Sequence, residues 1–184
     1  MKKVVFSDRD GVINRDSPDY IKNWSEFEFL PGSTTAIRHL TSHGFTTIVI
    51  TNQSMINRKI SSEEDLRHIH AMMRKAVISE GGEIRDIFFC PHAPEEGCDC
   101  RKPKPGLIYQ AQQAYQIDLK NACMIGDSAK DIECGRNAGC GRVVLVRTGN
   151  GITAEKRLVE KNIFPDHIAE NFYGAVKWVL RQAQ

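Results

Sequence analysis

Two aspartates one residue apart follow a short apolar run in the first ten residues. Asp8 and Asp10 come directly after Val4–Phe6, and Gly11 follows them. Alternate residues of an extended chain point to opposite sides, so both carboxylates can serve one site only if a turn begins here. Gly11 supplies the backbone freedom for such a turn. Acidic surface loops are common, so the pair indicates a site only in the company of other polar segments.

Three further polar segments follow along the chain, two of them at the ends of predicted strands and one between the third and fourth predicted strands. They are Thr51–Ser54, Arg101-Lys102, and Gly126–Ser128 with Asp131 beyond. Open α/β sheets bind ligands at the carboxyl ends of their strands, so we expect these segments to meet the two aspartates in one crevice. Together they offer carboxylates for a divalent cation, hydroxyl and amide donors for an oxyanion, and cations for negative charge. This set suits phosphoryl transfer, in which positioning and charge neutralisation do most of the catalysis.

Four potential zinc ligands occur within eleven residues, at Cys90, His92, Cys98 and Cys100. Three thiolates and an imidazole complete a tetrahedral zinc set with no open position, so the metal would be structural. The surrounding segment is rich in Pro and Gly and cannot bury enough apolar surface to hold itself. Zinc would close residues 90–100 and fix the basic pair that follows. The alternatives are incidental thiols beside a surface histidine, or a Cys98–Cys100 disulfide, which a reducing compartment disfavours.

Strand-like and helix-like segments alternate along the whole chain. The predicted strands are short apolar runs at 3–7, 45–51, 84–89, 122–125 and 142–146. Helical periodicity is present at 33–42, 62–80, 106–116, 130–138 and 171–184. Continuous apolar strands are typical of a sheet covered on both faces. The alternation predicts an α/β fold, a Rossmann-like three-layer sandwich with a central parallel sheet, in one domain of residues 1–184.

Charge and hydropathy exclude several classes of protein. The 184 residues carry a formal net charge of +2, and Lys and Arg are scattered, which argues against a nucleic-acid partner. No apolar run approaches the roughly 18 residues that a membrane span needs. The chain starts with Lys2 and a predicted strand and shows no signal-peptide pattern, so we expect a cytoplasmic protein, without a membrane partner and monomeric.

The order of the motifs resembles a known superfamily over nearly the whole chain. Asp8-x-Asp10-Gly11, Thr51-Asn52, Lys102 and Gly126-Asp127-x-x-x-Asp131 resemble the four motifs of the haloacid dehalogenase (HAD) phosphatases. Longer segments resemble the subgroup that hydrolyses heptose bisphosphate or histidinol phosphate; these are 8–14, 51–54, 90–92, 98–103 and 147–149. The resemblance implies a HAD-like fold without a large cap domain. It also implies removal of the C7 phosphate from D-glycero-D-manno-heptose 1,7-bisphosphate, for the ADP-heptose of lipopolysaccharide, with histidinol phosphate as the alternative.

The same resemblance implies roles for the acidic residues. Asp8 would be the nucleophile and form an aspartyl-phosphate. Asp10 would protonate the leaving alkoxide and then accept a proton from water, for which its pKa should lie above that of Asp8. Mg²⁺ would bridge the Asp8 carboxylate, the Asp10 carbonyl and Asp127. Asp131 would orient the groups around the metal without binding it directly.

Roles for the neutral and basic residues follow in the same way. Thr51 would donate its hydroxyl to the phosphoryl group, and Lys102 with Arg101 would balance the charge of the transition state. The sugar and its second phosphate would be bound by Asp16, Ser17, Asp19, Tyr20, Asn52, Gln53, Ser54 and Arg58. Cations in Arg58 and in the segment 147–150 favour a small phosphorylated sugar with two phosphates over histidinol phosphate.

Three positions depart from the subgroup's pattern. Met55 stands where heptose enzymes usually have Gly, Asn57 where Ala is usual, and Ser128 where some relatives carry Lys. We expect the Met55 side chain to narrow the substrate mouth. A zinc-stabilised binding module without activity is an alternative from another class, and the presence of both Asp8 and Asp10 argues against it.

The remaining cysteines and histidines carry no predicted chemistry. Cys123, Cys134 and Cys140 fall in or near predicted core elements and are expected to pack as small apolar residues. His68 and His70 lie two residues apart on one predicted helix, so they face different sides. These and the other histidines outside the cysteine cluster are expected to be surface or core residues.

Overall fold

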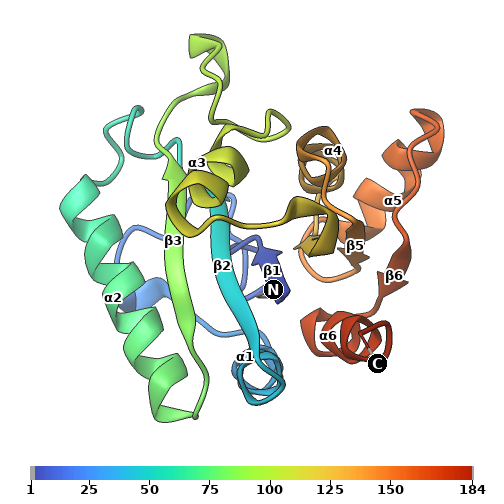
Figure 1. The fold of residues 1–184 in the computed structure, drawn as a ribbon. Helices are drawn as coiled ribbons and strands as arrows, with labels where there is room; N and C mark the ends of the chain where they lie inside the picture. Colours follow the sequence, from blue (N-terminus) through green and yellow to red (C-terminus); the bar gives the residue numbers. More distant parts are fainter. Residues whose placement is uncertain (1–2, 184) are drawn as a thin grey trace.

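Six parallel strands form one sheet in the computed structural model of the chain, which describes residues 3–183. The strands are β1 (Lys3–Ser7), β2 (Phe45–Asn52), β3 (Ile84–Cys90), β4 (Ala122–Gly126), β5 (Arg142–Val146) and β6 (His167–Ala169). Their order in the sheet is β3-β2-β1-β4-β5-β6, and every neighbouring pair is parallel. Figure 1 shows β3, β2 and β1 side by side, with β5 and β6 beyond them. This is the strand order of a doubly wound nucleotide-binding sheet.

Helices cover both faces of the sheet. They are α1 (Ser33–Ser42), α2 (Glu63–Ser79), α3 (Gly106–Tyr115), α4 (Ala129–Ala138), α5 (Gly151–Glu160) and α6 (Phe172–Arg181). Val5 and Val49 of the strands pack with α1, α2 and α6, whereas Phe6 and Ile48 pack with α3, α4 and α5. The sheet therefore lies between two helical layers, and the predicted three-layer α/β fold is confirmed.

The apolar runs become strands that are buried along their length. In β1, β4 and β5 every residue except the first residue of β1 and of β5 is buried, as parallel strands between two helical layers require. Helix ends are equally well defined. Ser62 caps α2 in a reciprocal capping box with Asp65, whose amide donates to Ser62 Oγ at 3.0 Å.

Most predicted elements match the structure within one or two residues. The predicted last helix is α6, which ends at Arg181, and its predicted end at Gln184 lies outside the described residues. Two elements, α5 and β6, were not predicted. Within residues 3–183 no helix combines the length and the hydropathy of a bilayer-spanning segment.

The sheet changes its winding direction between β1 and β4, and this point sets the position of the site. From β1 the chain winds through β2 to β3 at one edge, and then returns to β4 on the other side of β1. Asp8 follows β1 and Asp127 follows β4, so both lie at the carboxyl side of this switch point. Crevices of this kind are where open α/β sheets bind ligands.

Candidate active site

A tight turn after β1 brings the first two aspartates to one side. Gly11 adopts a φ of +78°, and its amide donates to the Asn14 carbonyl at 2.8 Å. A Cβ at Gly11 would overlap the Asp127 carboxylate, so this position needs glycine both for its dihedral and for its space. Asp8 and Asp10 consequently line the same cavity, and the turn predicted at Gly11 is confirmed.

The cavity has a volume of about 410 Å³ and lies at the carboxyl ends of β1, β2 and β4. It gathers thirteen residues that the sequence singled out: Asp8, Asp10, Asp16, Ser17, Tyr20, Thr51, Asn52, Gln53, Ser54, Arg101, Lys102, Asp127 and Ser128. These side chains come from four separate chain segments. The predicted convergence at one sheet edge is therefore present in the structure.

Lys102 is the buried cation of the site. Its Nζ donates to the Ile50 carbonyl at 2.9 Å, and lies 2.8 Å from Asp8 Oδ2 and 2.5 Å from Asp131 Oδ1. Although burial disfavours the charged form, these two carboxylates raise the pKa of Lys102. Asn52 fixes the backbone, because its Oδ1 accepts from the Lys102 amide at 3.1 Å. The ammonium group is thus charged and held by three acceptors.

Three carboxylates surround this ammonium group. One oxygen each from Asp8, Asp127 and Asp131 lies within 4.8 Å of the others. Burial, with the Asp131 charge beside it, raises the pKa of Asp127 to about 7, and burial with the same neighbour raises that of Asp8. One ammonium against three carboxylates leaves an excess of two negative charges, which a divalent cation with oxygen ligands would neutralise. The donor set therefore fits Mg²⁺.

Asp131 is not free to bind that cation directly. Its Oδ1 is paired with Lys102, and its Oδ2 accepts from the Ser128 amide at 3.0 Å and the Ser128 hydroxyl at 2.6 Å. These bonds form the capping box of α4. Asp8 and Asp127 are therefore the carboxylates available to a metal, and Asp131 orients the lysine.

Asp127 is held by a segment that follows β5. The Asn150 amide donates to Asp127 Oδ2 at 2.7 Å. Gly149 has a φ of +55°, and a Cβ there would overlap the same carboxylate. Thr148 Oγ1 donates to the Gly11 carbonyl at 2.6 Å, which ties this segment to the turn after β1. The segment therefore shapes the site through the Asn150 amide, the absence of a side chain at Gly149 and the Thr148 hydroxyl.

Asp10 occupies a different electrostatic environment from Asp8. Its Oδ1 accepts from Arg9 Nη2 at 2.8 Å and Asn14 Nδ2 at 2.9 Å, and its Oδ2 from Gln53 Nε2 at 2.7 Å. Burial alone would raise the pKa of Asp10, but the Arg9 guanidinium and these hydrogen bonds lower it. The pKa order is thus the reverse of the expected one, because Asp8 shares its surroundings with two carboxylates while Asp10 faces a guanidinium.

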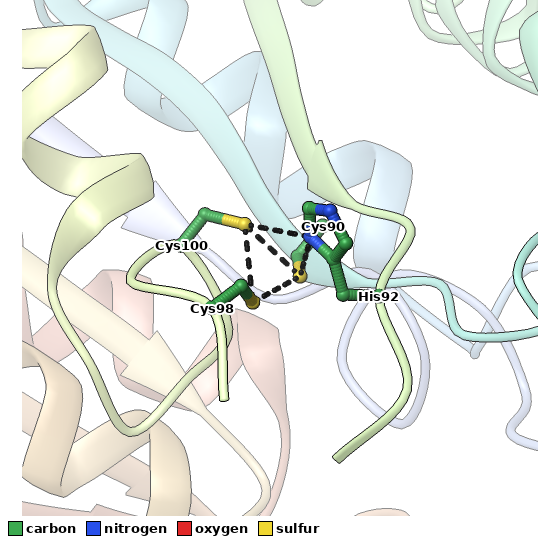
Figure 2. A group of neighbouring side chains, drawn as sticks. All are labelled: Cys90, His92, Cys98 and Cys100. Atoms are coloured by element: carbon green, nitrogen blue, oxygen red, sulfur yellow. Dashed lines mark hydrogen bonds between the residues drawn. The ribbon is translucent and has the colours of Figure 1, made fainter. Parts of the chain in front are cut away.

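The four predicted zinc ligands converge on one point (Figure 2). The three Sγ···Sγ distances are 3.6 Å for Cys90–Cys98, 3.5 Å for Cys98–Cys100 and 3.2 Å for Cys90–Cys100. His92 Nδ1 lies 3.6 Å from Cys90 Sγ and 3.3 Å from Cys100 Sγ. Zn–S bonds of about 2.3 Å give tetrahedral edges of about 3.8 Å, so the arrangement fits a zinc ion after slight expansion. All the cysteines are free, which contradicts the disulfide alternative.

The cysteine–histidine cluster supports two walls of the cavity. Arg101 Nη1 donates to the His92 carbonyl at 3.0 Å, next to Lys102. On the other side the Cys90 carbonyl accepts from the Gln53 amide at 2.7 Å. The cluster therefore fixes the basic pair and the loop after β2 together.

Comparison with known proteins identifies the family. The HAD-hydrolase-like family model matches residues 99–175. D-glycero-beta-D-manno-heptose-1,7-bisphosphate 7-phosphatase of Pseudomonas aeruginosa is 44% identical over 169 residues, covering 91% of this chain and 94% of that protein. D-glycero-alpha-D-manno-heptose-1,7-bisphosphate 7-phosphatase of Photorhabdus laumondii is 36% identical, with 88% and 93% covered. A crystal structure of the D,D-heptose 1,7-bisphosphate phosphatase from B. bronchiseptica, complexed with magnesium and phosphate, aligns over 99% of both chains with a TM-score of 0.90 and 36% identity.

The chain belongs to the heptose-bisphosphate phosphatase family of HAD-like hydrolases. It is thus a phosphoric monoester hydrolase, and the alternative of a binding module without activity is set aside. The resemblance stated from the motifs is confirmed. Every strand within residues 3–183 belongs to the one six-stranded sheet, so these residues contain no large cap domain.

Two arginines that were expected to bind the second phosphate of the substrate lie outside the cavity. Arg147 Nε lies 3.0 Å from Glu155 Oε2, and its Nη1 donates to Glu170 at 2.5 Å, so its charge is neutralised outside the cavity. Arg58 is half exposed and its Nη2 lies 3.9 Å from Glu95 Oε1. Neither side chain lines the cavity. Both guanidinium groups are paired with glutamates outside the cavity.

Two further expectations about the cavity wall do not match the geometry. Asp19 does not line the cavity, and its amide donates to Ser17 Oγ at 3.2 Å in the exposed part of that loop. Met55 is fully buried in the core and does not narrow the mouth. The side chain that replaces glycine points into the protein, behind the loop.

Two cations of the cavity were missed from the sequence. Lys130 lies in the first turn of α4 and Arg157 in α5, and both line the cavity. Among residues 3–183 neither forms an ion pair with a carboxylate. Lys130 could have been found from its place three residues after Asp127, whereas Arg157 belongs to the helix that was not predicted.

Proposed function

We propose that this enzyme removes the C7 phosphate of D-glycero-D-manno-heptose 1,7-bisphosphate, in the supply of ADP-heptose for lipopolysaccharide. The observation that carries the proposal is the joint placement of Asp8, Lys102 and Asp127 in a chain 44% identical to a heptose bisphosphate phosphatase. Names of relatives include both anomers of the heptose, so the anomer is a question for the assay.

Two proton transfers and two displacements make up the reaction. The negative charge of a bound substrate phosphate would raise the pKa of Asp10, which Arg9 lowers in the free site, so that Asp10 can carry a proton. A carboxylate oxygen of Asp8 attacks phosphorus, the bond from phosphorus to the sugar oxygen breaks, and Asp10 gives its proton to that oxygen. Water then attacks phosphorus of the aspartyl-phosphate and gives a proton to Asp10. Inorganic phosphate leaves, and the Asp8 carboxylate is restored.

The charged groups around Asp8 stabilise these steps. Asp8, Asp127 and the Asp10 carbonyl would hold Mg²⁺, which when bound neutralises charge on the phosphoryl oxygens. Lys102 stays charged and lies 2.8 Å from Asp8, where the transferring group is bound. Thr51 Oγ1 accepts from Gln53 Nε2 at 2.9 Å, which leaves its hydroxyl hydrogen free for a phosphoryl oxygen.

The second phosphate of the substrate requires cations that carboxylates have not already neutralised. Lys130, Arg157 and Arg101 line the cavity and supply them. Asp16, Ser17 and Asn150 offer hydrogen-bonding groups for the sugar hydroxyls, and Asn150 Nδ2 donates to Asp16 Oδ2 at 3.0 Å. Recognition would rest on charge and hydrogen bonds.

Three further features belong to this proposal. Zn²⁺ bound by the cysteine–histidine cluster would be structural, because its four protein ligands leave no open position. We also propose that the chain acts as one domain and as a monomer, and that it works in the cytoplasm, where activated sugars are made.

Phosphate release from both anomers of the heptose bisphosphate and from histidinol phosphate tests the proposal. We expect kcat/KM for one heptose anomer to exceed that for histidinol phosphate by roughly 100-fold, equivalent to about 2.7 kcal/mol of contacts to the second phosphate. Asp8→Asn should abolish all three activities. Faster release from histidinol phosphate would overturn the substrate assignment.

A further inference from the structure

Arg9, the residue between the two catalytic aspartates, is a fully buried charged side chain. It is 1% exposed and is among the largest fully buried side chains of the described residues. Its Nε and Nη2 donate to Asp10 Oδ1 at 3.1 and 2.8 Å, and its Nη1 lies 3.3 Å from His70 Nε2. A guanidinium group has only donors, and burial is tolerated when each is matched by an acceptor.

His70 supplies the acceptor on the far side of this guanidinium. It lies on α2, is 6% exposed, and packs edge-to-face on Phe89 with ring centroids 5.9 Å apart. Because Arg9 can only donate, His70 Nε2 must be the unprotonated ring nitrogen. Burial and the charges of Arg9 and Arg67 favour the neutral ring and outweigh the opposite effect of Asp10. Together they lower the pKa of His70 to about 3.

The two carboxylate oxygens of Asp10 accept different numbers of hydrogen bonds. Oδ1 accepts three N–H groups, two from Arg9 and one from Asn14 at 2.9 Å. Oδ2 accepts one, from Gln53 at 2.7 Å. A carboxylate oxygen with three charge-assisted or amide donors has no room for a proton, so the proton that Asp10 exchanges is carried on Oδ2.

We propose that His70 is a positioning residue for the general acid, acting through Arg9. By accepting from Nη1, His70 fixes the guanidinium plane, and the other two donors of Arg9 then hold Asp10 with Oδ2 toward the cavity. His70 does not line the cavity, so it would act on the reaction only through Arg9. The inference rests on the proposed phosphoryl transfer with Asp10 as acid and base, and it does not depend on which sugar is the substrate.

A positioning role for His70 predicts different effects on alkyl and aryl phosphates, which a general loss of stability would not produce. A sugar alkoxide leaves only as the Oδ2 proton passes to its oxygen, whereas p-nitrophenolate leaves with the bonding electron pair and needs no proton. Formation of the aspartyl-phosphate from p-nitrophenyl phosphate should therefore not depend on Asp10 geometry. Hydrolysis of the aspartyl-phosphate should depend on the geometry of Asp10, because Asp10 must then accept a proton from the attacking water.

The experiment compares His70→Leu with His70→Gln, whose amide oxygen can still accept from Arg9, and with His68→Leu on the exposed side of the same helix. The substrates are heptose bisphosphate, fructose 1,6-bisphosphate as a generic alkyl phosphate, and p-nitrophenyl phosphate followed by rapid mixing. Circular dichroism confirms folding. Should the leucine variant fail to fold, His70→Met takes its place with a similar volume and no strong acceptor.

For His70→Leu we expect kcat on the alkyl phosphates to fall roughly 10- to 100-fold, part of the 10²–10⁴ that general acid–base catalysis contributes. KM should change less than about twofold, and the p-nitrophenol burst rate should stay within about twofold. His70→Gln should recover most of the loss, and His68→Leu should match the parent enzyme. An equal fall in the burst and alkyl rates, no recovery in the glutamine variant, or no loss at all would each overturn the proposal. If the parent enzyme does not hydrolyse heptose bisphosphate, but the variants show the expected differences on fructose 1,6-bisphosphate, the proposed substrate is rejected and the role of His70 stands.

Discussion

Replacing Lys102 by Met tests whether one buried ammonium group balances the acidic cluster. The side chain is 2% exposed, and the carboxylates that it pairs with, Asp8 and Asp131, are 13% and 0% exposed. Methionine has a similar length and fills most of the same space, so the packing loss is small. The perturbation is then mainly the removal of one positive charge from between two negative ones.

The size of the effect follows from burial. Removing one partner of a buried ion pair costs about 3–5 kcal/mol, because the other charge is left without compensation. Two residues along the chain, Lys104 pairs with Asp99 at 3.0 Å, but these side chains are 48% and 99% exposed. A surface pair of this kind contributes about 0–1 kcal/mol. Lys104→Met is therefore a matched control in the same loop.

Thermal unfolding in EDTA measures the difference. For a chain of this size about 1 kcal/mol shifts Tm by about 2–4 °C, so Lys102→Met should lower Tm by roughly 6–20 °C and Lys104→Met by less than about 4 °C. Mg²⁺ should reduce the deficit of Lys102→Met, because it neutralises Asp8 in place of the ammonium group. Equal and small shifts in the two variants would refute the charge-balance reasoning.

Three further predictions concern the metals and the cavity rim. Burial and a neighbouring carboxylate raise the pKa of Asp127 to about 7, so the folded protein without Mg²⁺ holds a proton that the unfolded chain releases near pH 4. The free energy of unfolding should then fall by a few kcal/mol between about pH 4 and pH 7, and added Mg²⁺ should reverse the fall in urea titrations. Elemental analysis should find one zinc per chain, lost in Cys100→Ser with a lower Tm but kept in Cys140→Ser. Lys130→Ala and Arg157→Ala should each raise KM for heptose bisphosphate roughly tenfold and leave p-nitrophenyl phosphate unaffected, as steady-state assays will show.

The sequence predicted those parts of the fold whose apolar pattern is continuous. The strands around β1 and the helices with a clear buried face match, but α5 was missed because its buried positions, Gly151, Ala154 and Leu158, alternate with exposed Ile152 and Val159. Two of its three buried positions are Gly and Ala, so its buried face has few of the large apolar residues that mark the other helices. The three-residue edge strand β6 is too short to show any period.

Within the site, residues at strand ends were predictable, whereas on the helices only Asp131 of α4 was found, through its spacing from Asp127. The edge of a parallel sheet is fixed by topology, so Asp8, Thr51 and Asp127 had to meet there. Which face of α2 reaches the loop after β1 depends on packing, so His70 was expected to be a surface or core residue. Burial of Arg9 was not foreseen either, because a charge in a polar loop normally stays in water.

The hydrogen bond from Thr148 to Gly11 joins positions 137 residues apart in the chain. At about 5–20 residues per second, roughly 7–27 s of translation separate the two. During that interval the nascent polypeptide already carries its nucleophile, but no backbone amide yet restrains the aspartate at the end of β4. Phosphate hydrolysis therefore has to wait until the ribosome has passed Asn150 and that residue has emerged.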